Sequence, residues 1–77
     1  MKITFYAGAA DAAGTATRTL EGPLTANQLR EALGRDNERL AVVLSRCSLL
    51  ADGVHVSEDD LVPAGAAVDV LPPFAGG

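Results

Sequence analysis

The chain has 77 residues, of which 48% are hydrophobic, and a net charge of −4 at pH 7. This length and composition predict one folded domain with a thin core and exclude a disordered chain. The single cysteine, Cys47, excludes a disulfide framework and any zinc or iron–sulfur site held by this chain alone. Because no apolar run approaches the roughly 18 residues of a membrane span and no leader is visible, we expect a cytoplasmic protein without membrane contact.

Negative charge is concentrated in the last part of the chain. No Lys or Arg follows Arg46, whereas five acidic residues do: Asp52, Glu58, Asp59, Asp60 and Asp69. Nucleic-acid binders need clustered cations, so we expect no nucleic-acid partner. Two interpretations of the acidic segment stay open, namely electrostatic attraction to a partner with a basic entrance and a solvated face that aids solubility.

The first third of the chain predicts a strand followed by a short helix. Residues 2–7 alternate, with Ile3 and Phe5 on one face and Tyr6 on the other. Residues 9–13 predict one helical turn that ends at Gly14, a residue suited to the left-handed position after a helix.

A second strand and a capped helix come next. Threonine-rich residues 15–21 favour a strand. Thr25 and Gln28 match a capping box, in which each side chain accepts a hydrogen bond from the other residue's backbone N–H. The helix is therefore predicted over residues 26–33, with Gly34 as its C-terminal stop.

A further helix is predicted up to about Arg46, capped by Asp36 or by Asn37. Its apolar residues recur at helical spacing and form one stripe: Leu40, Val43, Leu44 and Cys47. Because Cys47 ends this stripe, we interpret it as a buried small hydrophobic residue rather than a reactive thiol.

A hairpin follows the helices. Residues 49–51 predict a strand, Asp52–Gly53 is a two-residue turn signal, and the chain then returns with Val54 and Val56 inward and His55 outward. His55 has no Ser, Cys or carboxylate arrangement around it that indicates a catalytic triad, so we interpret it as a surface or contact residue.

The last strand is predicted over residues 67–71, with Val68 and Val70 inward and Leu71 outward. Two strands, two helices and three short strands in this order predict an α+β fold, a small mixed sheet packed on helices in a roll of β-grasp type. We expect one domain over residues 1–71.

Residues 72–77 form a separate extended tail in this interpretation. Pro72 and Pro73 fix φ and remove two backbone donors, so no ladder or helix continues through them. Phe74 and Ala75 lead to Gly76 and Gly77, which have no side chains and would pass through a narrow channel. The alternative is a frayed terminus without function.

The root of this tail predicts a docking surface. In a β-grasp sheet the first and last strands are parallel neighbours, so Tyr6 and Leu71 lie together on the outward face, and His55 points outward from another strand. An exposed aromatic ring beside a leucine is typical of a protein interface. The alternative is that helix packing covers these residues.

The sequence resembles the small sulfur-carrier subunit of molybdopterin synthase, a member of the ubiquitin-like β-grasp group. The resemblance rests on Phe5-Tyr6-Ala7, Gly14, the capped helix with Leu29 and Leu33, the Asp52–Gly53 turn, and residues 72–77. The chain departs from its relatives at Asp52, where an Asn-Gly turn is common, and at His55, where relatives can carry an apolar contact residue.

The resemblance implies a defined chemistry for Gly77. An ATP-using, ubiquitin-activating-like enzyme would adenylate its carboxylate, and sulfur transfer would leave a terminal thiocarboxylate. That group would donate its sulfur to a cyclic pterin phosphate in the large, catalytic subunit of the synthase, during molybdenum cofactor biosynthesis. The chain itself is expected to bind no metal or cofactor, since ATP is used by the activating partner.

Three alternatives stay open. The chain could be a sulfur carrier for thiazole (thiamin) or cysteine synthesis, a ubiquitin-like modifier joined to lysines through Gly77, or a plain interaction domain. In each of the sulfur-carrier interpretations, catalysis lies in the partners, because the chain shows no paired carboxylates, phosphate-binding loop or activated nucleophile.

Overall fold

The computed structural model of the protein describes residues 1–73. Its strands are β1 (Lys2–Phe5), β2 (Thr17–Thr19), β3 (Leu24–Thr25), β4 (Ser48–Ala51), β5 (Val54–His55), β6 (Leu61–Val62) and β7 (Ala67–Leu71). Its helices are α1 (Gly8–Ala13), α2 (Ala26–Gly34) and α3 (Glu38–Leu44). Every strand expected from the sequence is present.

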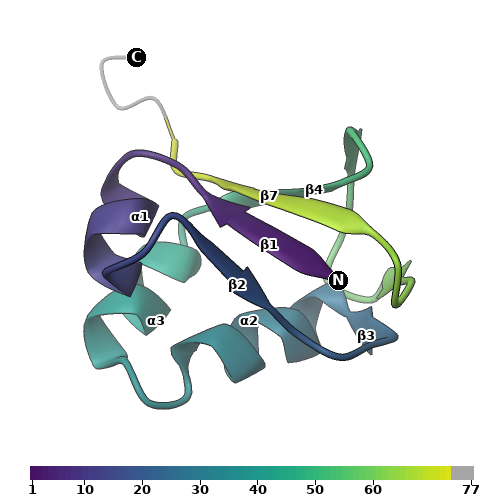
Figure 1. Ribbon diagram of the computed structural model, residues 1–77, viewed down its shortest axis with the longest axis horizontal. Coiled ribbons are helices and arrows are strands. Elements are labelled where there is room, and N and C mark those ends of the chain that lie inside the picture. Colours follow the sequence, from purple (N-terminus) through teal and green to yellow (C-terminus); the bar gives the residue numbers. More distant parts are fainter. Residues whose placement is uncertain (74–77) are drawn as a thin grey trace.

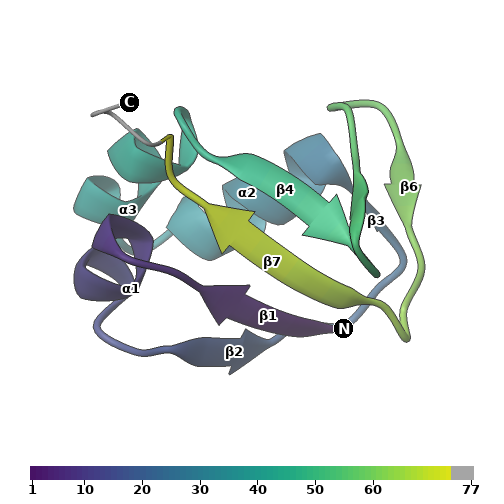
Figure 2. The same ribbon diagram turned by 90° about the horizontal axis from the view of Figure 1, so that it is seen from above.

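The main sheet has five strands in the order β2-β1-β7-β4-β5. The last strand, β7, lies in its centre, parallel to β1 and antiparallel to β4. Phe5 pairs with Val70, and Ser48 pairs with Leu71. Figure 2 shows this sheet in front, with the helices behind it. The chain's first and last strands are therefore neighbours, as the sequence predicted.

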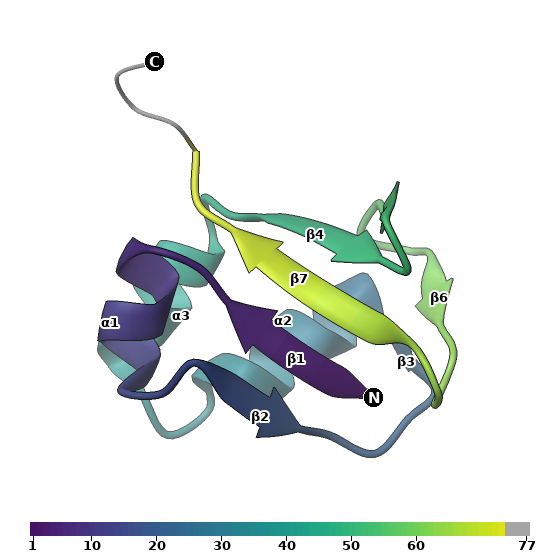
Figure 3. The ribbon, with the colours of Figure 1, turned by 45° about the horizontal axis from the view of Figure 1, so that its top comes forward.

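Alternation along the strands divides the sheet into a buried and an open face. The inward residues of the three central strands are almost completely buried: Ile3, Phe5, Leu49, Val68 and Val70. All three helices gather on this side of the sheet (Figure 1) and contribute Ala9, Leu29, Leu33, Leu40 and Leu44 to the same core. The opposite face carries no helix among residues 1–73 (Figures 2 and 3).

The capping box at the start of α2 is confirmed. The backbone N–H of Gln28 donates to Thr25 Oγ1 at 3.1 Å, and the N–H of Thr25 donates to Gln28 Oε1 at 2.9 Å. The loop before β6 supplies two more acceptors, because Ala26 N donates to the Asp60 carbonyl and Asn27 N to the Glu58 carbonyl, both at 3.0 Å. The first turn of α2 is thus bonded to the loop that leads into β6.

Gly34 has a different role from the one predicted. It is the last residue of α2, and the helix is followed by Arg35 in right-handed helical geometry, so Gly34 is not a left-handed stop. A Cβ at this position would lie 2.8 Å from Ala41 Cβ and 3.0 Å from Ala41 Cα. Gly34 is therefore needed for the close approach of α2 and α3 rather than for ending a helix.

Asn37, not Asp36, caps α3. Its Oδ1 accepts from Leu40 N at 3.0 Å, while its Nδ2 donates to the carbonyl of Ala12 in α1 at 2.8 Å. The helix ends at Leu44, so Cys47 follows it in a turn, where it is buried as expected. Burial raises the pKa of the Cys47 thiol, which disfavours the reactive thiolate.

The hairpin between β4 and β5 turns at Asp52 and Gly53, with φ of 50° and 82°, as the sequence predicted. Val54 was predicted to point inward, but its side chain is 67% exposed. It directly follows the turn in an edge strand of two residues, whose one bonded neighbour in the main sheet is β4. Val56 does pack against the core.

One strand pair was not predicted. Residues of β3 pair with β6 in a second, two-stranded sheet, with Leu24 opposite Val62. With this addition, the architecture is the predicted α+β roll of β-grasp type. Within the part of the chain that the structure describes, no helix is both long and apolar enough to cross a membrane.

Candidate functional site

The predicted tail starts at the end of the central strand. Leu71 is the last residue of β7, Pro72 is partly buried and Pro73 is exposed. The other predicted tail residues, Phe74, Ala75, Gly76 and Gly77, lie outside the described residues, so their roles stay predictions. The structure does define the surface from which the tail begins.

Tyr6 and Leu71 lie together at this point. Phe5 is opposite Val70, and the N–H of Tyr6 donates to the Val70 carbonyl at 3.2 Å, which brings Tyr6 next to the end of β7. Directly afterwards Ala7 has a φ of 50°, a region that non-glycine residues rarely adopt. This turn takes the chain into α1 and leaves Tyr6 on the margin of the open face.

The Tyr6 side chain is 43% exposed, and its hydroxyl donates to Asp69 Oδ1 at 3.3 Å. The negative charge of Asp69 raises the pKa of Tyr6, with smaller contributions from burial and from this hydrogen bond. The aromatic ring is therefore held over the last strand in its neutral form.

Two residues beyond those predicted belong to this surface. Asp69 faces outward from β7, with Thr4 of β1 and Leu50 of β4 directly opposite it. Leu50 is only partly buried, because its neighbour Leu49 takes the inward position. Tyr6, Leu50, Asp69 and Leu71 form the surface that we call the outer patch.

His55 lies at the margin of the outer patch. It is exposed on β5 and pairs with Leu50, which in turn pairs with Asp69. With strands about 4.8 Å apart, His55 is two strands, or roughly 10 Å, from Asp69. The structure thus brings Tyr6 and Leu71 together as predicted and places His55 further away, on the other side of Leu50.

Leu50 and Asp69 were missed as site residues, although the sequence carried a signal for both. Strand alternation after a buried Leu49 predicts an outward Leu50, and the alternation of β7 predicts an outward Asp69. What the sequence could not supply is the register, which aligns both residues with each other and with His55.

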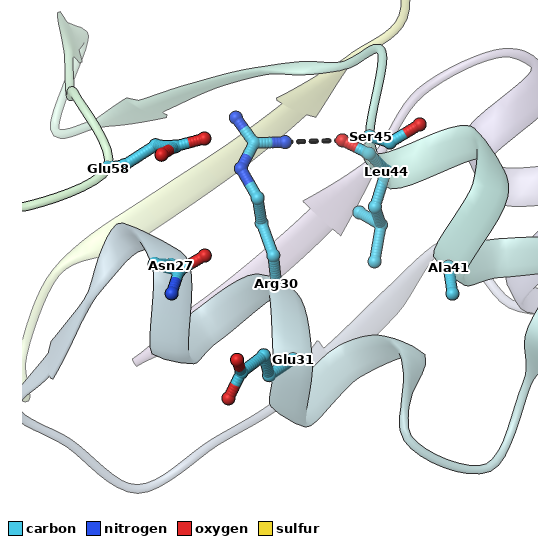
Figure 4. A pocket seen from close by; sticks show the side chains of 7 residues that line it. All are labelled: Asn27, Arg30, Glu31, Ala41, Leu44, Ser45 and Glu58. Carbon is cyan, nitrogen blue, oxygen red and sulfur yellow. Dashed lines mark hydrogen bonds between the residues drawn. The ribbon is translucent and has the colours of Figure 1, made fainter.

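A separate cavity of about 360 Å³ lies between α2, α3 and the loop that contains Glu58 (Figure 4). Its lining is Asn27, Arg30, Glu31, Ala41, Leu44, Ser45 and Glu58. Arg30 Nη1 donates to the Leu44 carbonyl, and the Ser45 hydroxyl donates to the Val42 carbonyl at 2.6 Å. The Arg30 bond ties α2 to the end of α3, and the Ser45 bond lies within the last turn of α3. None of the predicted site residues lines the cavity, and its one hydroxyl is not paired with a base.

Comparisons with known proteins agree with this geometry. The sequence model of the ThiS family matches residues 3–77. A search of curated protein sequences found no significant match. A solved structure from Pyrococcus furiosus, assigned as molybdopterin converting factor subunit 1, superposes with a TM-score of 0.80 at 20% identity, over 95% of each chain.

Two solved structures from Haloferax volcanii are similar to the same extent. SAMP1 superposes with a TM-score of 0.79 at 23% identity, over 100% of this chain and 98% of that one. A structure of small archaeal modifier protein 1 gives a TM-score of 0.78 at 21% identity, over 96% and 97% of the two chains. At these identities the similarity shows a shared ubiquitin-like β-grasp fold.

Proposed function

Because the chain belongs to the ThiS family of ubiquitin-like sulfur carriers, we propose that it carries sulfur as a thiocarboxylate on Gly77. The observation that carries this proposal is that the family match runs through residues 72–77 to Gly77 itself. The fold supports it, since residues 72–77 follow directly from the central strand of the sheet. The tail therefore begins at a strand that is hydrogen-bonded to a neighbour on both sides.

The recipient that we propose is a cyclic pterin phosphate in the large subunit of molybdopterin synthase. The Pro72-Pro73 pair before the final glycines and the similarity to a protein assigned as molybdopterin converting factor subunit 1 support this choice. Two sulfur donations to the pterin would build the dithiolene that later binds molybdenum. Catalysis then lies in the large subunit, and this chain is its sulfur-donating subunit in the cytoplasm.

Sulfur loading requires activation of the Gly77 carboxylate, because its delocalised charge makes it a poor electrophile. We propose that a ubiquitin-activating-like enzyme transfers AMP from ATP to the carboxylate and releases pyrophosphate. Sulfur at the sulfide level, supplied as hydrosulfide on that enzyme, then attacks the acyl adenylate, forms the C–S bond, expels AMP and leaves the thiocarboxylate. In this scheme Gly76 and Ala75 provide clearance in the narrow channels of both partners, while Pro72, Pro73 and Phe74 set the direction of the tail.

The outer patch is the surface that we propose for docking these partners. It lies next to the root of the tail, it combines a tyrosine with two leucines, and no helix among residues 1–73 covers it. Tyr6 offers a large ring with a polar group, a combination favoured at interface centres. His55 would contact a partner only at the margin.

A second candidate function follows from the similarity to SAMP1 and to small archaeal modifier protein 1 of Haloferax volcanii, the second of which is named as a modifier. In that case the activated Gly77 would form an isopeptide bond with a lysine of a target protein. Sulfur carriers for thiazole or cysteine synthesis are the alternatives within the family. All of these functions begin with the activated Gly77. They differ in the acceptor, which is a lysine for the modifier and a small molecule that takes up sulfur for the carriers.

The test is the intact mass of the protein after co-expression with the activating enzyme encoded in the same genome. We expect the mass of a chain that ends at Gly77 with one oxygen replaced by one sulfur. A variant that lacks Gly77 should remain unmodified and should keep its thermal stability, because residues beyond the last strand bury little of the core. An unmodified parent chain, or sulfur on the truncated variant, would refute the carrier function.

The same preparation separates the candidates. Transfer of the sulfur to a cyclic pterin phosphate by the large synthase subunit would establish the molybdopterin pathway. Lysine-linked conjugates that appear in the cell and depend on Gly77 would instead establish the modifier function.

A further inference from the structure

We infer that the partner docked on the outer patch places an arginine guanidinium against Asp69. This inference rests on the proposed function, because it names a chemical feature of the partner that the sulfur-carrier function requires. It starts from a carboxylate in an unusual position: Asp69 lies in the middle strand of the sheet, on the face without helices.

The residues directly beside Asp69 on the open face are uncharged. Its neighbours across the strands are Thr4 and Leu50, and along β7 the next outward residues are Ala67 and Leu71. Its side chain is already partly buried. Among residues 1–73, the one side chain that donates a hydrogen bond to Asp69 is Tyr6, through its hydroxyl. A carboxylate has about four acceptor positions, so one hydroxyl leaves most of them to water.

Docking of an apolar partner surface on Tyr6, Leu50 and Leu71 would remove that water from Asp69. A desolvated carboxylate is strongly unfavourable unless a cation and further hydrogen-bond donors replace the water. A partner without such groups would therefore bind the centre of the outer patch weakly. A partner with a cation there would be attracted and oriented by the same carboxylate.

This chain does not supply the cation itself. Residues 47–77, which include β4, β5 and β7, contain no Lys or Arg. Arg18 of the edge strand β2 points to the other side of the sheet, where its Nη1 donates to the Leu33 carbonyl. Lys2 is on the open face, but it lies opposite Ala67, one diagonal step from Asp69 at the far end of β1.

An arginine fits better than a lysine. Tyr6 occupies Asp69 Oδ1 from one side, which leaves Oδ2 and the remaining lone pair of Oδ1 for a planar donor pair. A guanidinium donates two parallel N–H bonds to a carboxylate and is less strongly hydrated than an ammonium, so it suits a desolvated site.

The test measures binding of the parent and of Asp69→Asn to the purified activating enzyme and to the large synthase subunit, by titration calorimetry. Asp69→Asn keeps the shape of the side chain and an acceptor for Tyr6 but removes the charge. We expect at least roughly 30-fold weaker binding to one or both proteins, because the partner's cation is left facing a neutral amide. Circular dichroism checks that the variant is folded.

Two variants serve as controls, one for a general effect of charge and one for Lys2. Asp59→Asn makes the same chemical change at an exposed loop position, so its effect should stay below about fivefold and should disappear at high salt. Lys2→Gln tests whether Lys2 is the counter-ion after all, and we expect binding close to that of the parent.

Unchanged or tighter binding of Asp69→Asn would overturn this inference, and so would a loss on Lys2→Gln as large as that on Asp69→Asn. In both cases the parent would still acquire sulfur, so the proposed function would stand. If the parent bound neither protein and acquired no sulfur, the proposed function would fail and this inference with it.

Discussion

Asn37 joins two helices through opposite ends of one amide, and its replacement tests how much that junction stabilises the fold. Its Oδ1 caps α3 by accepting from Leu40 N, and its Nδ2 satisfies the partly buried carbonyl of Ala12 at the end of α1. Asn37→Ala removes both bonds. Loss of the cap costs about 1 kcal/mol, and the unsatisfied carbonyl costs about 1–3 kcal/mol.

The expected loss of unfolding free energy for Asn37→Ala is thus about 2–4 kcal/mol. For a domain of this size each kcal/mol corresponds to about 4–8 °C, so the melting temperature should fall by roughly 10–30 °C. Thermal unfolding followed by circular dichroism measures this change. Asn37→Asp keeps the capping acceptor but has no donor for Ala12, so its melting temperature should lie between those of the parent and Asn37→Ala.

Asp36→Ala is the matched control, because Asp36 is the exposed neighbour that does not cap the helix. It should change stability by less than about 0.5 kcal/mol. If Asn37→Asp melted with the parent, the bond to Ala12 would contribute nothing. If Asp36→Ala were as destabilised as Asn37→Ala, the cap itself would be wrongly assigned.

Three further results are expected. Gly76→Val should dock normally but lose most product formation in a reconstituted synthase assay, because a branched side chain next to Gly77 would block the partner's narrow channel. Turnover like that of the parent would show that clearance is not the role of Gly76. Leu71→Asp should weaken docking by about 2–4 kcal/mol, or roughly 30- to 1,000-fold in calorimetry, because it places an unpaired charge in the contact. The fold should change little. Affinity equal to that of the parent would show that the interface lies elsewhere. The only tyrosine, Tyr6, should titrate above the usual tyrosine pKa of 10.0 in an ultraviolet pH titration. Asp69→Asn should lower that pKa, because it removes the nearby negative charge that disfavours tyrosinate. Identical titrations of the parent and the variant would refute the contact between the two side chains.

The sequence predicted those elements whose signals are local. The alternation of Ile3 and Phe5, the capping box of Thr25 and Gln28, and the Asp52–Gly53 turn each depend on residues a few positions apart, and all three are present. The position of β7 beside β1 also followed, because few arrangements connect these elements without crossing.

The errors and omissions concern contacts between distant segments. The role of Gly34 depends on Ala41 in another helix, and the exposure of Val54 accompanies its position in a two-residue strand at the edge of the main sheet. Strands of two residues such as β3 and β6 are too short to show a period of two. The choice between Asp36 and Asn37 as cap was open because both have a suitable acceptor. Asn37 also has the amide donor that the carbonyl of Ala12 needs.

The candidate site was predicted in part for the same reason. Tyr6 directly follows the C-terminal end of β1, and Leu71 lies at the C-terminal end of β7. The parallel pairing of these two strands was therefore enough to predict that the two residues are neighbours. Asp69 and Leu50 gain their significance only from the register of β1, β7 and β4, which fixes what lies opposite each side chain.

The central place of β7 also governs when the protein folds during synthesis. Residues 67–71 insert between β1 and β4, and the pairing of β1 with β7 closes a loop that contains nearly the whole domain. Such long-range pairing is slow and cannot begin until the last strand has left the ribosome. A chain that stops before residue 67 leaves one side of β1 and one side of β4 unpaired and splits the main sheet into two strand pairs. The strand that leads to the proposed sulfur-carrying residue is thus the one that completes the sheet, so only chains synthesised to their last strand can present a tail to the activating enzyme.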